Sequence, residues 1–204
     1  MLTFTDESKK STIQNFCLLS ERCNSARELK ENLIYSEYRG INLNSNTLND
    51  NDLMQLQRLT YVEDLSIANT KITGECLRTL LFIPGLKVLD ISHNRTLEPY
   101  LTANILCEFL QKTQLEELDL SGNQFGCLEL LALIAAAYTS ATQGNFKTLI
   151  LGKLEHLENH HDDQIDLLYR GMQTLAQINP AVTIECSTFA GYEMYLNNNK
   201  LKLY

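Results

Sequence analysis

The chain has 204 residues, of which 44% are hydrophobic and 21% are charged, so its composition is that of one globular domain and excludes wholesale disorder. Its formal net charge of -8 argues against a protein that neutralises phosphate groups or docks on an anionic membrane. The longest apolar stretch, from Leu128 to Tyr138, is too short to cross a bilayer, and the opening residues MLTFTDESKK lack the pattern of a secretory signal.

Two short helices are predicted at the start of the chain. Ser11 to Leu19 places Ile13, Phe16 and Leu19 on one helical face. The segment Ser25-Ala26-Arg27-Glu28 has the spacing of a capping box and opens a second helix that runs through Leu33. We therefore expect residues 1–35 to form a helical N-terminal cap.

An eleven-residue pattern then recurs along the chain. Its clearest copy is LEELDLSGNQF, from Leu115 to Phe125, with apolar residues at the first, fourth, sixth and eleventh places and Asn at the ninth. Related stretches begin at Tyr38, Val62, Leu86, Phe146 and, in a shortened form, Asn179, so the starts are 24, 24, 29, 31 and 33 residues apart. The apolar fourth and sixth residues alternate with polar ones, which predicts a strand with one buried face in each copy.

The Asn at the ninth place is predicted to be structural. Asn46, Asn94 and Asn123 can donate to and accept from backbone groups that a turn leaves unpaired, so we expect them to stack as a ladder. Four positions depart from the pattern: Thr70 and Leu154 replace Asn, and Thr96 and His156 replace apolar residues.

The segments between the copies are predicted to be helices, because they carry apolar residues at helical spacing. They are Asn51–Leu59, a segment from Thr73 that ends before Pro84, a segment from Thr102, Leu128–Ala141, and a segment capped by Asp162 or Asp163. No single copy can bury its own apolar face, so a continuous core along the stack is expected.

These copies, over Ser36 to Cys186, resemble the leucine-rich repeat family, and their spacing is similar to that of its ribonuclease-inhibitor-like type. The resemblance implies an α/β solenoid: a curved parallel sheet with helices on its convex side. The domain plan that follows is a cap at 1–35, about six repeats at 36–186, and a C-terminal cap or tail at 187–204.

The end of the chain admits several interpretations. Phe189, Tyr192 and Tyr195 lie at three-residue steps and are expected to cover the end of the core. Residues Lys200 to Tyr204 are a loose tail, a short edge strand with Leu201 and Leu203 on one side, or a sorting or secretion signal.

Catalytic chemistry is not expected from this sequence. The six cysteines (Cys17, Cys23, Cys76, Cys107, Cys127 and Cys186) form no Cys-x-x-Cys pair and are interpreted as reduced, mostly buried thiols. His156, His160 and His161 lie beside Asp162 and Asp163, which raises the alternative of a metal-dependent enzyme. However, the segment lacks the Glu of a His-Glu-x-x-His motif, so we predict a solvated loop and neither metal nor cofactor.

The candidate site is the concave face of the predicted sheet. The side chains that lie between the buried ones include six carboxylates and one lysine, so this face is acidic. The residues predicted to contact a partner are Glu63, Asp64, Ser66, Lys87, Asp90, Ser92, Glu116, Glu117, Asp119 and Ser121. They would receive a basic or mixed-charge segment of another protein; the alternative is that these charges only keep the protein in solution.

The function predicted is therefore a non-catalytic protein–protein interaction module, acting as a monomer in the cytoplasm and binding neither nucleic acid nor membrane. The resemblance extends to translocated effectors of bacteria that live inside host cells. A second hypothesis is an enzyme regulator of the GTPase-activating or ubiquitin-ligase-adaptor kind. The first of these would carry an acidic tail, whereas this tail has Glu193 against Lys200 and Lys202.

Overall fold

The computed structural model of the chain describes residues 39–44, 47–54, 56, 61–154, 157, 162–178, 182–186 and 201–203. The predicted N-terminal cap at 1–35 and the aromatic residues at 189, 192 and 195 lie outside the described residues. The same is true of Asn46 and of the three histidines His156, His160 and His161. Predictions on those residues stay predictions.

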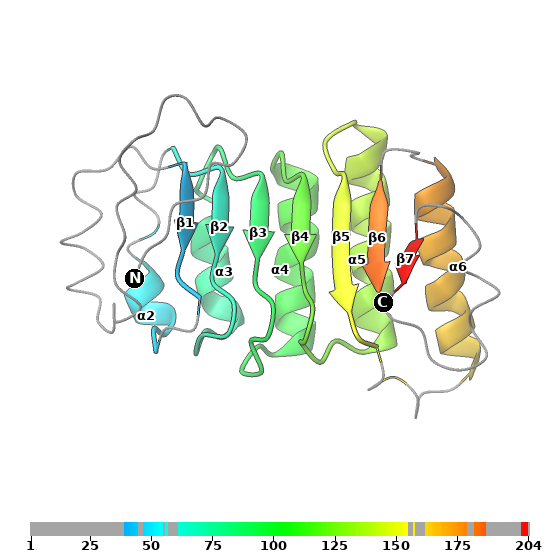
Figure 1. The fold of residues 1–204 in the computed structure, drawn as a ribbon, viewed down its shortest axis with the longest axis horizontal. Helices are drawn as coiled ribbons and strands as arrows, with labels where there is room; N and C mark the ends of the chain where they lie inside the picture. The colour runs from blue at the N-terminus through cyan, green and yellow to red at the C-terminus, as the bar shows by residue number, and fades with distance from the viewer. Residues whose placement is uncertain are drawn as a thin grey trace.

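The described residues form a parallel sheet whose strands follow one another in chain order (Figure 1). The strands are β1 (Gly40–Asn42), β2 (Asp64–Ser66), β3 (Val88–Asp90), β4 (Glu117–Asp119), β5 (Thr148–Gly152), β6 (Thr183–Cys186) and β7 (Leu201–Leu203). Each strand pairs in parallel with the next. Of the alternatives predicted for the tail, the short edge strand is the one observed, as β7.

The register of the sheet confirms the phase of the sequence pattern. Leu65 lies opposite Leu89, Leu89 opposite Leu118, and Leu118 opposite Leu149. All four side chains have no exposed surface. Apolar residues at one place in each copy therefore form a continuous row through the interior. The register shifts only between Ile150 and Gly152, in the irregular fifth copy.

Helices connect the strands and cover one face of the sheet (Figure 1). They are α2 (Asp50–Leu53), α3 (Gly74–Leu80), α4 (Pro99–Lys112), α5 (Cys127–Thr142) and α6 (Asp162–Ile178). Neighbouring helices pack on one another, and their inner residues join the inward strand residues in one apolar core. A parallel sheet requires such crossovers, because a tight turn cannot bring the chain back to the same edge.

Two helix boundaries differ from the prediction. Helix α4 begins at Pro99, three residues before Thr102, because Pro is favourable in a first turn and the Glu98 carboxylate accepts from the backbone N–H groups of Tyr100 and Leu101. Helix α2 ends at Leu53, far short of Leu59. Its start is fixed by Asn49, which forms a capping box with Asp52.

The predicted asparagine ladder is confirmed for Asn94 and Asn123, which are 1% and 6% exposed. Asn94 donates through Nδ2 to the carbonyl oxygens of Ile67 and Ile91, both at 2.9 Å, and Asn123 donates in the same way to Ile91 and Leu120, both at 3.0 Å. The Oδ1 atom of Asn123 accepts from the Asn94 amide, and that of Asn94 accepts from Thr70. Thr70 takes the ladder position in the copy that lacks Asn, and its hydroxyl donates to the Ile67 carbonyl oxygen at 3.1 Å.

Candidate functional site

The candidate site is the sheet face opposite the helices, which we call the open face. Residues at the first and third places of the strands point to this side, because the residue between them is buried in the core. On β2, β3 and β4 the open-face residues are Asp64, Ser66, Val88, Asp90, Glu117 and Asp119, all partly exposed. Four of these six are carboxylates, so the acidic character predicted for the face is present at its centre.

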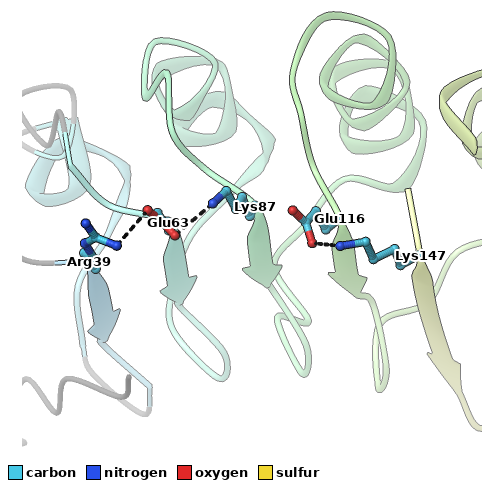
Figure 2. A network of polar contacts seen from close by, with 5 residues as sticks. All are labelled: Arg39, Glu63, Lys87, Glu116 and Lys147. Carbon is cyan, nitrogen blue, oxygen red and sulfur yellow. Dashed lines mark hydrogen bonds and ion pairs between the residues drawn. The ribbon is translucent and has the colours of Figure 1, made fainter. Parts of the chain in front are cut away.

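A row of alternating charges lies just before the strands, and we call it the edge row (Figure 2). Its members are Arg39, Glu63, Lys87, Glu116 and Lys147. Glu63 forms ion pairs with Arg39 at 3.5 Å and with Lys87 at 3.0 Å, and Glu116 pairs with Lys147. Since these side chains are partly exposed, each pair contributes at most about 1 kcal/mol to stability.

The edge row includes three members of the predicted contact set. Glu63, Lys87 and Glu116 are already paired with one another or with Arg39 and Lys147, and their role as partner contacts stays a prediction. Two of the six predicted carboxylates are therefore neutralised. The sequence pattern carried the signal, because opposite charges recur at the same place in successive copies.

Three carboxylates at the centre of the open face form what we call the carboxylate cluster: Asp90, Glu117 and Asp119. Asp90 lies directly opposite Asp119 in the register of β3 and β4. None of the three forms an ion pair with a lysine or arginine in the described part of the chain. Like charges opposite one another in a sheet are unfavourable, so the cluster is an uncompensated negative centre.

The pKa values of two members respond to this environment. The pKa of Glu117 is raised first by burial and then by the neighbouring charges of Asp119, Glu185 and Asp90. The pKa of Asp119 is also raised by burial, with a further contribution from Asp90. Hydrogen bonds from Ser121 and the proximity of His93 act in the opposite direction on Asp119. A cation that arrived here would favour the ionised forms of both groups.

Two of these carboxylates also hold the turns that follow their strands. Asp90 accepts from the backbone N–H of Ser92 at 2.9 Å, and Asp119 accepts from that of Ser121 at 2.8 Å. Asn42 accepts from the Asn44 N–H at 2.9 Å in the same way on β1. These two-residue links are typical of Asx-turns. The carboxylates are consequently fixed in orientation before any partner arrives.

A polar cavity of about 590 Å³ lies at the carboxyl ends of β1 to β3, and we call it the rim cavity. It is lined by Asn44, Ala68, Asn69, Asp90, Ser92, His93 and Arg95. Only Asp90 and Ser92 of these belong to the predicted contact set. Ser92 was expected to point outward from the sheet, which is wrong: it is 5% exposed, because the turn folds it against its neighbours, and its side chain lines the cavity.

The sequence analysis missed His93 and Arg95. His93 has a φ of 57°, and its ring lies over Gly122, where an added Cβ atom would be 2.2 Å from His93 Nδ1. The equivalent turn place in the preceding copy, Asn69, also has a positive φ of 52°. The sequence did hold an indication that His93 lies in this turn. The residue before the ladder asparagine is Gly122 in the clearest copy, and His93 stands at the same place in the copy before it.

The described cysteines are not placed for nucleophilic chemistry. Cys76, Cys127 and Cys186 are buried thiols, and Cys107 is partly buried. Burial raises the pKa of all four, and that of Cys186 reaches about 11. The thiolate is the reactive form, so at neutral pH these groups are poor nucleophiles.

In the described ranges, no group of three or more His, Cys, Asp or Glu side chains is arranged to hold a metal ion. None of the described helices combines the length and the apolar character needed to span a membrane.

Comparison with known proteins gives a likeness in structure only. No protein-family model matches the chain, and no curated protein matches it. Among solved structures 39 chains match. One of them is the tropomodulin C-terminal domain from Caenorhabditis elegans, with a TM-score of 0.48 and 17% sequence identity over 75% of this chain and 92% of that domain.

Proposed function

We propose that this chain is a non-catalytic protein-binding module of the leucine-rich-repeat kind, and that its open face binds a basic or mixed-charge segment of another protein. The observation that carries the proposal is the carboxylate cluster of Asp90, Glu117 and Asp119. It has no cationic partner among the described residues, whereas the edge row beside it is paired.

The cluster is better suited to a partner than to stability. Asp90 and Asp119 face one another at matched register, which costs free energy in the isolated chain. A lysine or arginine side chain placed between them would remove that repulsion. Because turn amides already hold both carboxylates, little side-chain entropy remains to be lost on binding.

The same charges would act before contact is made. A negative centre on a net negative chain attracts cationic segments, speeds their encounter and disfavours acidic competitors. This contribution is screened over about 8 Å at physiological ionic strength. The association rate should therefore fall as salt is added, more steeply than the dissociation rate rises.

A binding role rather than a catalytic one is supported by the chemistry of the described residues. The open face presents carboxylates and small hydroxyl side chains, and the described thiols are buried or partly buried. In the proposal, Asp64, Ser66 and Ser121 complete the contact surface around the cluster. The edge row frames that surface and fixes its position on the sheet.

Charge reversal tests the proposal. A partner captured on the immobilised protein is identified by mass spectrometry and purified, and its affinity is measured by titration calorimetry. The variant Asp64→Lys/Asp90→Lys/Asp119→Lys should bind that partner at least roughly 100-fold more weakly, which is a few kcal/mol spread over three groups.

A matched control changes the net charge by the same amount on the helices. Glu75→Lys/Glu129→Lys/Asp163→Lys replaces exposed or partly exposed carboxylates of α3, α5 and α6 and should leave the affinity within about threefold. Circular dichroism would establish that both variants remain folded. Equal losses in the two variants would show that only net charge matters, and an unchanged affinity in the first would remove the open face as the site.

A further inference from the structure

The wall of the rim cavity carries a hydroxyl group that makes no hydrogen bond within the described residues. It belongs to Ser92, whose side chain is 5% exposed and lines the cavity. The Ser92 Oγ atom is not among the fully buried side-chain atoms that lack a partner in the described part of the chain, so it is open to the cavity. It can therefore bond to a polar group that enters from outside.

The carboxylate of Asp90 stands beside this hydroxyl with unused acceptor capacity. Asp90 accepts from Ser92 N–H through Oδ1 and from the Ser66 hydroxyl through Oδ2. An ionised carboxylate offers about four acceptor positions, so roughly two remain. The Ser66 hydroxyl lies 2.5 Å from Asn44 Oδ1, which in turn accepts from the Ala68 N–H at 2.8 Å. This network fixes the carboxylate on the cavity wall.

The charge around the cavity favours a cation. Asp90 is close enough to Asp119 and Glu117 to raise the pKa of both, so three carboxylates act on the same space. The cationic side chain that lines the cavity is that of Arg95, which is exposed and has no hydrogen bond or ion pair within the described ranges. The net charge of these side chains around the cavity is therefore negative, because three carboxylates outweigh Arg95.

From these observations we infer that the rim cavity receives one arginine side chain of the partner segment. The guanidinium group has five donors in a planar fork, which matches the free acceptor positions of Asp90 together with the Ser92 hydroxyl. Arg95 then donates to a backbone carbonyl or a carboxylate next to the inserted arginine, which accounts for the mixed charge of the segment. The inference rests on the proposed function, because it assigns the anchor of that interaction.

A partner-free titration tests the cavity directly. The probe is Nα-acetyl-arginine amide, added to the full chain and followed by amide shifts in a ¹H–¹⁵N correlation spectrum. The neutral isostere Nα-acetyl-citrulline amide and the anionic Nα-acetyl-glutamate amide are the comparison probes. The arginine probe should bind with a dissociation constant near the millimolar range, with the largest shifts at Asn69, Ser92 and His93, and the other two should bind at least roughly tenfold more weakly.

Two variants and a matched control locate the contact. Asp90→Asn keeps the acceptor for the Ser92 amide and should weaken the arginine probe by roughly tenfold or more; Ser92→Ala should weaken it by a smaller factor, about threefold. Glu75→Gln removes the same charge on helix α3, where it does not line the cavity, and should change the affinity less than about twofold. Dispersed spectra would show that each variant is folded.

Several outcomes would overturn the inference: equal binding of the citrulline probe, tighter binding of the glutamate probe, shifts confined to other strands, or an equal loss in Glu75→Gln. The experiments distinguish a failure of arginine binding in the rim cavity from a failure of the proposed function. If the partner still depends on the open face but the arginine probe does not bind, the inference is wrong and the function stands. If the probe binds the cavity while the charge-reversed triple variant keeps the partner, the proposed function is wrong.

Discussion

At the scale of single residues, the turn after each strand imposes the strictest requirement on side-chain identity. Asn69, His93 and Gly122 occupy the same place in successive copies, and all three have a positive φ. Asn tolerates this conformation well and a bulky side chain less so. Gly122 meets a second constraint, because the His93 ring occupies the space that a Cβ atom would need.

A pair of glycine substitutions separates these two constraints. Gly122→Ala should lower the free energy of unfolding by about 2–4 kcal/mol, because it adds a steric conflict with His93 to the backbone penalty. Gly144→Ala also changes a glycine of positive φ but meets nothing within 4 Å, so it should cost only about 1 kcal/mol. Urea unfolding followed by circular dichroism measures both.

The double variant Gly122→Ala/His93→Ala completes this comparison. Removal of the His93 ring should restore the part of the free energy of unfolding that Gly122→Ala loses in excess of Gly144→Ala. Only the penalty for the positive φ should then remain. Equal losses at Gly122 and Gly144 would contradict the proposed contact.

The residues of the candidate site could be predicted only in part. Asn94 and Asn123 were identifiable, because a buried amide that pairs with turn backbone recurs at a fixed place. The burial of Ser92 and the position of His93 were missed, because the alternation of a strand was extended past its end, where the chain turns and buries Ser92. Likewise, Glu63 and Lys87 were placed on the face, but their pairing was not predicted, although their opposite charges stand at the same place in successive copies.

At the scale of elements, strand phase was easier to predict than helix extent. The alternation of buried and open residues fixes which face Leu65, Leu89 and Leu118 occupy, because a shift by one residue would expose all of them. The start of α4 depends on local capping by Glu98 and Pro99, which the apolar pattern does not contain.

The contact between strands β3 and β4 gives a prediction for pH dependence. The pKa values of Glu117 and Asp119 are raised in the folded state, so the folded chain holds protons more strongly than the unfolded chain. Stability should then fall as pH rises from the ordinary carboxyl pKa of about 4 through the raised values, and stay lower above them. Glu117→Gln should make this decline shallower and add about 0.5 kcal/mol at pH 7.

The control for this prediction is Glu75→Gln on α3, whose carboxylate pairs with Arg78 at 3.7 Å. It should leave the stability at pH 7 within about 0.5 kcal/mol and should not flatten the pH profile. Urea unfolding at several pH values would measure both variants. A profile that is identical in the Glu117 variant and the unmodified chain would show that the carboxylates of the cluster do not repel one another.

At the scale of the whole molecule, the units share one core and should unfold together. Leu118 has no exposed surface and lies between Leu89 and Leu149 on the adjacent strands. Leu118→Ala should therefore leave an enclosed cavity and cost about 3 kcal/mol. Val88→Ala, on the open face of the adjacent strand β3, should cost less than about 1 kcal/mol.

The cooperativity of unfolding is measured in the same experiment. Circular dichroism and tyrosine fluorescence should give coincident transitions in the unmodified chain and in the Leu118 variant. Separate midpoints for the two signals would show that the units unfold independently and that the interior is not continuous.

The edge row also restricts how such a chain can lengthen. Arg39, Glu63, Lys87, Glu116 and Lys147 alternate in sign from one unit to the next. Duplication of a single unit within this row would place two like charges side by side, whereas duplication of two successive units would preserve the alternation. Insertion of one extra unit would therefore replace an opposite-charge neighbour with a like-charge one at a cost of up to about 1 kcal/mol, and insertion of two successive units would avoid that cost.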